Sequence, residues 1–194
     1  EGLIDRANVQ PGEKVLVLGG AGGVGHMVVQ LAQAKGAAVF AVDGPAKTMT
    51  IEGYGATAID RDTSVEDYVA AFTGGEGFDV VYDTVGGTSL DAAFRAVKNY
   101  TGRVVSCLGW GTHALAPLSF RAATYAGVFT LMPLLSGKGR AHHGKILQEA
   151  AKLAENGRLL PRLDPARYTF AEADRAHDAL RQRKADGKVV IEIA

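Results

Sequence analysis

The sequence predicts an α/β protein with a mainly parallel sheet, and three observations support that class. Short apolar runs alternate along the chain with segments whose apolar residues recur at helical spacing. A glycine-rich turn lies between the first apolar run and the first helical segment. After about residue 133 a shorter α-β-α-β pattern follows and predicts a small C-terminal appendage.

The elements of the larger part follow in order. The first strand is predicted at 14–18, because a short apolar run that ends in glycines is typical of a buried parallel strand. Five more strands are predicted at 38–42, 56–59, 79–82, 103–108 and 125–131. The connecting helices are predicted at 23–34, 63–72 and 89–97. Gly36 ends the first helix, and Thr63-Ser64-Val65-Glu66 has the capping-box pattern that begins the second.

The appendage is expected to begin with a loop around 136–140 and a long helix at 142–155, which Asn156-Gly157 ends. A short strand is predicted at 159–163. Thr169-Phe170-Ala171-Glu172 is a second capping box, and it begins a helix that reaches about Arg183. A last strand is predicted at 188–193. The division expected from this pattern is 1–133 for the sheet domain and 134–194 for the appendage.

Composition excludes several classes of protein. The 194 residues carry 21 basic and 21 acidic side chains, so the formal net charge is zero and no basic cluster indicates nucleic-acid binding. No apolar run reaches the ~20 residues of a membrane-spanning helix. One cysteine, Cys107, cannot form an internal disulfide, which favours a reducing compartment such as the cytoplasm. The 25 glycines are the one excess, and their positions carry the functional prediction.

The glycine-rich turn contains the pattern Gly20-x-Gly22-x-x-Gly25, directly after a predicted strand and at the start of a predicted helix. Gly20 allows the tight turn, Gly22 lets the backbone approach a pyrophosphate, and Gly25 lets the helix lie close to the strand. The first turn of the helix offers unpaired N–H groups to phosphates. We therefore predict that Gly20, Gly22, Gly23, Val24 and Gly25 bind a dinucleotide.

Asp43, at the end of the second predicted strand, is the acidic residue that this fingerprint requires. Its carboxylate can accept hydrogen bonds from the adenosine ribose hydroxyls. It would repel the 2′-phosphate of NADP by roughly 4 kcal/mol at 4 Å and an effective dielectric constant of about 20. The sequence therefore favours NADH. Two alternatives stay open: Asp43 could serve only the Asp43-Gly44-Pro45 turn, and Lys47 could neutralise a 2′-phosphate.

These residues resemble the cofactor domain of medium-chain dehydrogenases/reductases, and the similarity is closest to the zinc-independent quinone oxidoreductase branch. The resemblance runs over essentially the whole chain. It rests on Pro11-Gly12-Glu13-Lys14-Val15-Leu16-Val17, Gly22-Gly23-Val24-Gly25, Gln30-Leu31-Ala32, Phe78-Asp79-Val80-Val81-Tyr82-Asp83-Thr84-Val85-Gly86-Gly87, Gly102-Arg103-Val104-Val105, Ala176-His177 and Gly187-Lys188-Val189-Val190.

The resemblance implies a doubly wound, six-stranded Rossmann sheet with NAD(P)H across its carboxyl edge. It places Thr84, Val85 and Gly86 near the nicotinamide, and likewise Leu108-Gly109-Trp110. It also implies a homodimer that pairs through strand six, near Val128–Leu131. For the hydrophobic members of these segments, a role in the sheet core or the packed interior is the alternative.

The resemblance further implies that the chain lacks a substrate-binding barrel domain, which the appendage would complete. The chain opens at Glu1 without a signal peptide, which agrees with a missing beginning. The isolated chain is therefore expected to bind cofactor but to reduce substrate poorly. No zinc is expected, because no Cys-x-x-Cys motif is present and His142-His143 point about 100° apart on a helix.

The predicted function is hydride transfer between a nicotinamide cofactor and a small-molecule quinone, enone or related carbonyl compound. No catalytic residue can be assigned from the sequence, and Cys107 is expected to be a buried small hydrophobe rather than a nucleophile. Two alternatives belong to other classes. One is a nucleotide-binding module without catalysis, and the other is an S-adenosylmethionine-dependent methyltransferase, which also uses a glycine-rich turn.

Overall fold

A computed structural model describes residues 1–182 and 184–193. The chain divides into two compact units, 1–159 and 160–194. The division expected from the sequence lay at 133, so the long helix beyond that point belongs to the first unit instead of the second. None of the helices in the described part is both long and apolar enough to cross a membrane.

The first unit is built on one six-stranded sheet in the order β3-β2-β1-β4-β5-β6, and every strand pair is parallel. The strands are β1 (Lys14–Leu18), β2 (Ala38–Asp43), β3 (Thr57–Asp60), β4 (Val80–Asp83), β5 (Arg103–Ser106) and β6 (Thr124–Gly127). The strand order reverses between β1 and β4. This arrangement confirms the predicted α/β class and the doubly wound Rossmann topology, in which ligands bind where the order reverses.

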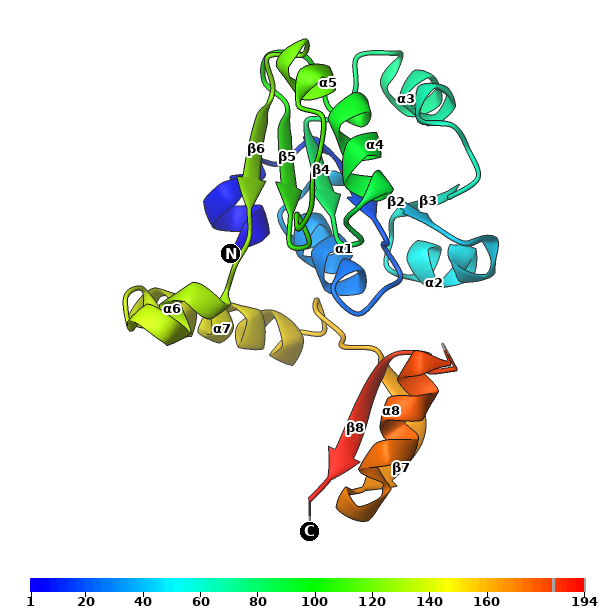
Figure 1. Ribbon diagram of the computed structural model, residues 1–194, viewed down its shortest axis with the longest axis vertical. Helices are drawn as coiled ribbons and strands as arrows, with labels where there is room; N and C mark the ends of the chain where they lie inside the picture. The colour runs from blue at the N-terminus through cyan, green and yellow to red at the C-terminus, as the bar shows by residue number, and fades with distance from the viewer. Residues whose placement is uncertain (183, 194) are drawn as a thin grey trace. The chain divides into compact units, whose positions relative to one another are not determined.

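Helices cover both faces of the sheet (Figure 1). One face is covered by the short π-helix η1 (Gly2–Arg6), by α1 (Gly25–Ala34) and by α2 (Thr48–Gly53), which follows the 3₁₀ turn η2 (Pro45–Lys47). The other face is covered by α3 (Val65–Thr73), α4 (Thr88–Ala96) and α5 (Ala116–Ser119). The first unit also contains α6 (Leu131–Ser136) and α7 (Arg140–Glu155).

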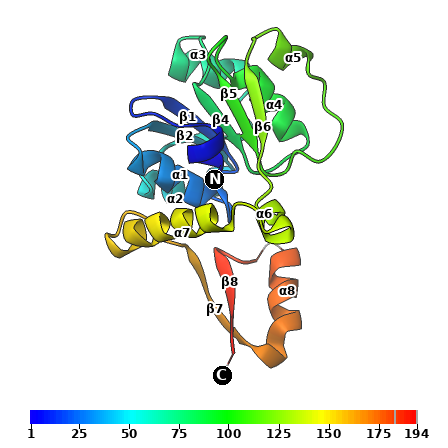
Figure 2. The ribbon, with the colours of Figure 1, turned by 90° about the vertical axis from the view of Figure 1, so that its left-hand side faces the viewer.

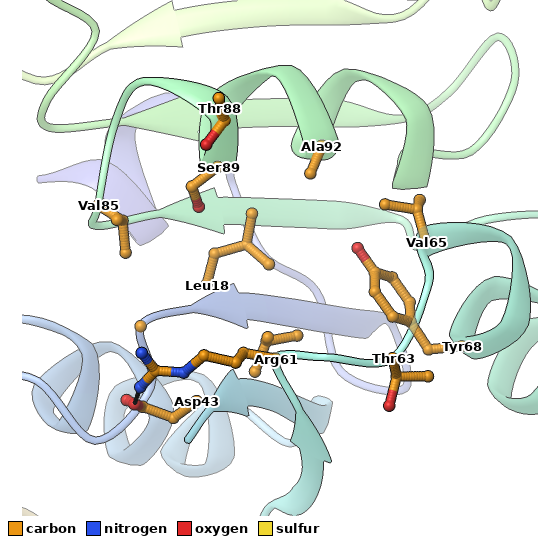
Figure 3. A pocket seen from close by; sticks show the side chains of 12 residues that line it. Leu18, Asp43, Arg61, Thr63, Val65, Tyr68, Val85, Thr88, Ser89 and Ala92 are labelled. Carbon is orange, nitrogen blue, oxygen red and sulfur yellow. Dashed lines mark hydrogen bonds and ion pairs between the residues drawn. The ribbon is translucent and has the colours of Figure 1, made fainter. Parts of the chain in front are cut away.

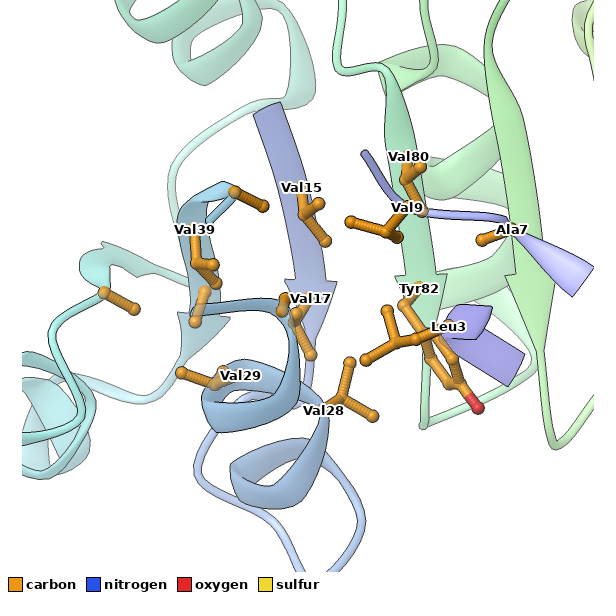
Figure 4. Close-up of a cluster of buried hydrophobic side chains, with 14 of the residues drawn as sticks. Leu3, Ala7, Val9, Val15, Val17, Val28, Val29, Val39, Val80 and Tyr82 are labelled. Carbon is orange, nitrogen blue, oxygen red and sulfur yellow. The ribbon is translucent and has the colours of Figure 1, made fainter. Parts of the chain in front are cut away.

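The apolar positions of the sequence explain this layering. Residues of β1 alternate between the two cores: Val15 and Val17 face α1, whereas Leu16 and Leu18 face α3 and α4. Figure 4 shows the first core, where Val28 of α1 lies against the strands. Because α1 buries one apolar stripe, its position over the carboxyl end of β1 is fixed by packing.

Several predicted boundaries in the first unit are wrong, among them the end of the strand predicted at 103–108, because β5 ends at Ser106. The strand predicted at 125–131 ends at Gly127, because its partner β5 ends at Ser106 and offers no further ladder, and Leu131 begins α6 instead. The second helix is capped by Ser64, whose side chain accepts a hydrogen bond from the amide of Asp67 at 3.1 Å, and not by Thr63.

The second unit, described by itself, holds a two-stranded parallel sheet of β7 (Leu163–Thr169) and β8 (Lys188–Glu192). Between these strands lie the 3₁₀ turn η3 (Phe170–Glu172) and helix α8 (Ala173–Arg181). The capping box of Thr169 and Glu172 is confirmed. The strand predicted at 159–163 is wrong, because pairing with β8 begins only at Leu163. The predicted helix end at Arg183 lies outside the described residues.

Two buried tyrosines make the stability of the first unit sensitive to alkali. Burial raises the pKa of both Tyr68 and Tyr82 to about 12, whereas an unfolded chain titrates near pH 10. The folded state therefore holds more protons than the unfolded state between about pH 10 and 12, so stability falls across that window, by on the order of 1–3 kcal/mol for each phenol. Urea unfolding at a series of pH values would measure this fall, and Tyr82→Phe should make it shallower. An equal slope in that variant would contradict the assignment.

Candidate nucleotide-binding site

The glycine-rich turn joins β1 to α1 and leaves no room for side chains at three positions. Gly19 has φ +77°, and a Cβ on it would lie 2.7 Å from Oγ1 of Thr84. A Cβ on Gly20 would lie 2.5 Å from the Cβ of Ala41, and one on Gly25 would lie 2.0 Å from the carbonyl oxygen of Gly19. The tight turn therefore depends on the backbone freedom of Gly19. Gly20 is needed instead for the close approach to β2, which corrects the role predicted for it.

Backbone hydrogen bonds hold this turn in place. The amides of Gly19 and Gly20 donate to the carbonyl of Val42 at 2.9 and 3.2 Å, and the amide of Gly22 donates to the carbonyl of Gly19 at 3.0 Å. Gly22, Gly23 and Val24 are exposed at the tip of the turn. Val24 is the N-cap of α1 and provides no side-chain cap. The amides of His26 and Met27 already donate to the carbonyls of Gly22 and Val24, at 3.1 and 3.0 Å, so the open part of the turn is the exposed backbone at 22–24. This cradle fits a pyrophosphate.

Asp43 ends β2 beside the glycine-rich turn. Its Oδ2 accepts a hydrogen bond from the amide of Ala21 at 2.9 Å. Its Oδ1 accepts from the amide of Gly44 at 2.8 Å and from Nη2 of Arg61 at 2.9 Å. Asp43 thus holds the turn at Gly44, as one of the two sequence interpretations predicts, and its carboxylate also borders the glycine-rich turn at Ala21.

A pocket of about 380 Å³ lies directly beyond Asp43, within the range of roughly 300–1,000 Å³ that is usual for small-molecule sites. It is lined by the carboxyl ends of β1 and β2, by Arg61 and Thr63 after β3, by Val85 after β4, and by residues of α3 and α4. Figure 3 shows Arg61 reaching along the pocket to Asp43, while Leu18 and Val85 lie above them in that view. Arg61 was missed in the sequence, although its position after β3 could have indicated it, since β2 and β3 end side by side.

Lys47, the other charged candidate, lies at the end of η2 and is not among the residues that line this pocket.

The loop after β4 carries Thr84, Val85 and Gly86, and its conformation is set by Asp83. The Asp83 carboxylate is fully buried and accepts hydrogen bonds from the amides of Val85 at 3.2 Å and of Gly86 at 3.0 Å. The hydroxyl of Thr84 donates to the carbonyl of Leu18 at 2.7 Å. Val85 is left 55% exposed and is the member of this loop that reaches the pocket.

The loop after β5 carries Leu108, Gly109 and Trp110 and is joined to the same carboxylate. Ser106 donates from its hydroxyl to Oδ2 of Asp83 at 2.7 Å and accepts from the amide of Leu108 at 3.1 Å. Gly86 touches this loop, since a Cβ on it would lie 2.5 Å from the carbonyl oxygen of Leu108. The structure therefore brings the two predicted loops together at the carboxyl edge of the sheet.

Gly109 and Trp110 differ in their surroundings. A Cβ on Gly109 would lie 2.1 Å from the hydroxyl of Tyr125, so a larger residue there would require the Tyr125 side chain to move. Trp110 is 65% exposed and meets the ring of Phe129 edge-on, with centroids 5.8 Å apart. Trp110 is thus not a core residue. Cys107, expected to be buried, is half-buried. Burial raises the pKa of its thiol, with a further contribution from Asp83, and this keeps the thiol protonated.

The adjacent histidines of α7 point to separate partners. Nε2 of His142 lies 2.7 Å from a carboxylate oxygen of Asp5, and Nε2 of His143 lies 2.8 Å from a carboxylate oxygen of Glu1. Both partners belong to the N-terminal segment that forms η1 and its N-cap. The pair therefore attaches α7 to this segment and does not converge on one point.

A parallel sheet in this order, with a glycine-rich cradle and an acidic residue after β2, defines a Rossmann-type nucleotide-binding fold. The family model described as "Zinc-binding dehydrogenase" matches residues 54–191, and the chain belongs to this family. The fold of the family binds a nicotinamide cofactor. Within residues 1–182 and 184–193, no three His, Cys, Asp or Glu side chains come together to hold a metal ion. The described residues therefore do not fit the zinc that the family description implies.

Solved structures of similar proteins support this family assignment. An alcohol dehydrogenase superfamily protein from Novosphingobium aromaticivorans is 52% identical, with a TM-score of 0.97 over 100% of this chain and 60% of its own. The CurK enoyl reductase is 27% identical, with a TM-score of 0.82 over 100% of this chain and 58% of its own. A mycobacterial quinone oxidoreductase is 26% identical, with a TM-score of 0.81 over 97% of this chain and 59% of its own.

Among curated relatives, mycoketide-CoA synthase from Mycobacterium tuberculosis is 35% identical over 193 residues, which make up 97% of this chain and 4% of that protein. The chain thus spans about 60% of the solved oxidoreductases and a small part of much longer synthases. The similar proteins include a quinone oxidoreductase and an enoyl reductase, which supports an oxidoreductase family.

Proposed function

We propose that this chain is the NAD(P)H-binding part of an oxidoreductase that transfers hydride to a quinone, an enone or a related carbonyl compound. The observation that carries the proposal is the turn at Gly19–Gly25. Side chains are sterically excluded at Gly19, Gly20 and Gly25, while Gly22 and Gly23 stay exposed. A turn that served only chain reversal would not need an open backbone surface beside an acidic residue and a pocket.

Each part of the site has a separate role in this proposal. The exposed backbone of the turn at Gly22, Gly23 and Val24 holds the pyrophosphate. Asp43 accepts from the adenosine ribose, and the pocket beside Arg61 takes the adenine. Val85 also lines the adenine pocket and therefore lies between the two ends of the site, whereas Leu108 and Trp110 form the apolar surface on which the nicotinamide end rests. When bound here, a reduced nicotinamide would supply the hydride, and the acceptor would take its proton from solvent or from a group outside this site.

Similarity to an enoyl reductase and to a quinone oxidoreductase supports a conjugated acceptor. Both acceptors carry an electrophilic carbon in conjugation with a carbonyl, and both are flat and largely apolar. The exposed apolar side chains on the loops after β4 and β5 suit such a molecule. We expect no dedicated catalytic residue among these loops, because the side chains they present at the edge are apolar.

A titration tests the proposal directly. Thermal unfolding of the chain should shift upward with NADH or NADPH, by about 2.7 kcal/mol of added stability at a ligand concentration one hundred times Kd. S-adenosylmethionine serves as the control ligand, because methyltransferases also use a glycine-rich turn and an acidic residue. Stabilisation by the methyl donor alone would overturn the proposal.

Cofactor preference depends on the pair formed by Asp43 and Arg61. We propose a preference for NADH, because Asp43 faces the position of a 2′-phosphate. Asp43→Ser should weaken NADH binding and favour NADPH relative to it by about tenfold, since the variant removes a negative charge and releases the guanidinium of Arg61. Arg61→Ala is the matched variant and should shift the ratio of the two dissociation constants toward NADH. Fluorescence titrations of both cofactors measure the ratio, and an unchanged ratio in Asp43→Ser would mean that Asp43 serves only the turn.

Two further proposals concern the oligomeric state and the cellular location of the protein. We propose a homodimer formed near the free edge of the sheet at β6 and the following segment, Val128–Leu131, which light scattering of the purified chain can measure. A reducing, cytoplasmic location is proposed from the single cysteine.

A further inference from the structure

The segment 107–115 leaves the carboxyl end of β5, passes α4 and leads to α5 (Figure 2). It begins with the residues that we assign to the nicotinamide end of the site. Its far end is attached to α4 by His113, whose Nδ1 lies 2.8 Å from Oδ1 of Asp91. Within the described residues, no other hydrogen bond is made by residues 109–114. The pair of His113 and Asp91 is thus the polar attachment of this segment.

The side chain of His113 is partly buried beside an aromatic ring. Its side chain is 11% exposed, and its ring meets Phe94 edge-on with centroids 6.3 Å apart. Phe94 in turn meets the ring of Tyr125 edge-on at 6.0 Å, and the hydroxyl of Tyr125 lies against Gly109. Both ends of the segment therefore lie against one chain of rings, formed by residues of α4 and β6.

The second ring nitrogen of His113 indicates why a histidine stands at this position. Its Nε2 is buried and has no hydrogen-bond partner among the described residues. Burying a polar atom without a partner costs roughly 1–3 kcal/mol, and an apolar ring would fill the same space without that cost. What histidine adds is the hydrogen bond from Nδ1 to the Asp91 carboxylate. This bond is charge-assisted, because the carboxylate is its acceptor.

We propose that Asp91 and His113 are positioning residues, which fix segment 107–115 on α4 and thereby hold Leu108 and Trp110 at the cofactor edge. The proposal rests on the proposed function, because that function assigns a role to this edge. The first consequence concerns Trp110, which lies three residues before His113 and contacts Phe129. Releasing the attachment should release this contact as well.

The chain offers a direct reporter, since Trp110 is its single tryptophan. Fluorescence excited selectively at tryptophan, and not at the six tyrosines, therefore reports on this segment alone. His113→Phe keeps an aromatic ring against Phe94 but removes the bond to Asp91. His113→Asn places an amide donor near the position of Nδ1, and Asp91→Ala removes the acceptor without changing the ring. His177→Phe, at an exposed position of α8, is the matched control.

We expect His113→Phe and Asp91→Ala to make Trp110 more accessible to acrylamide quenching in the absence of any ligand. Both should weaken NADH binding by about tenfold, which corresponds to one lost hydrogen bond to a charged group. The thermal midpoint of His113→Phe should stay near that of the wild type, because the packing on Phe94 is kept. His113→Asn should restore the quenching and most of the affinity, and His177→Phe should change neither.

Unchanged quenching and unchanged NADH affinity in both His113→Phe and Asp91→Ala would overturn the proposal. Equal loss in His113→Asn and His113→Phe would also overturn it, because packing and not the hydrogen bond would then be the cause. If the wild type binds neither NADH nor NADPH, the proposed function fails. The quenching comparison still decides whether the pair fixes the segment, so the two failures are distinguishable.

Discussion

Gly25→Ala is expected to destabilise the first unit by about 3 kcal/mol and to abolish nucleotide binding. A Cβ at this position would lie 2.0 Å from the carbonyl oxygen of Gly19 and 2.8 Å from Cα of Gly20. Both are backbone atoms of the turn, so neither can move aside as a flexible side chain would. The helix α1 would have to shift away from β1 and would take the exposed backbone at 22–24 away from the phosphates. Urea unfolding and an NADH titration measure the two effects.

Two further glycine variants separate steric packing from cofactor contact. Gly144→Ala lies in helix α7, where a Cβ would meet no atom within 4 Å, and it should raise stability by roughly 0.5–1 kcal/mol. Gly22→Ala would meet only the carbonyl of Gly19, at 3.1 Å, so it should fold and still bind NADH more weakly. A Gly25→Ala chain as stable as the wild type would contradict the close contact between α1 and the turn.

Local patterns explain why most of the sheet could be predicted. The first strand was placed at its observed bounds, 14–18, because its apolar run is bordered by glycines. The helix before Gly36 was equally clear, since one apolar stripe repeats through it. The end of β6 could not be predicted from its own residues, because it depends on where β5 stops. The short helices α2, α5 and α6 were missed, as none is long enough to show a helical period.

Part of the candidate site could likewise be predicted from the sequence, and part could not. The glycines and Asp43 follow one another at fixed spacing along the chain, so their joint role was visible in the sequence. Which glycine makes the turn could not be predicted, because the answer depends on contacts with Ala41 of β2 and with Thr84 in the loop after β4. Arg61 and the pair of Asp91 and His113 carry no motif. Arg61 contacts Asp43 because β2 and β3 lie side by side, and His113 contacts Asp91 because of the path of the loop after β5. Both arrangements are defined only by the folded chain.

Asp83 joins the two loops on which the nicotinamide end of the site is proposed to rest. Its carboxylate is fully buried and accepts from the amides of Val85 and Gly86 and from the hydroxyl of Ser106. Ser106 passes the connection on by accepting from the amide of Leu108. A buried carboxylate is tolerated only when its charge is compensated by donors, and here the donors belong to the loops themselves. The position of both loops should therefore depend on this one side chain.

Asp83→Ala should lower the free energy of unfolding by about 3 kcal/mol, because it leaves three donors without their acceptor. Ser106→Ala should cost about 1 kcal/mol and affect only the second loop, since the bonds from Asp83 to Val85 and Gly86 are kept. Amide hydrogen exchange distinguishes the two variants: Gly86 and Leu108 should both exchange faster in Asp83→Ala, and Leu108 alone in Ser106→Ala. NADH affinity should fall in the same order. If Asp83→Ala binds NADH as the wild type does, the loops are held by packing alone and the carboxylate has no part in shaping the site.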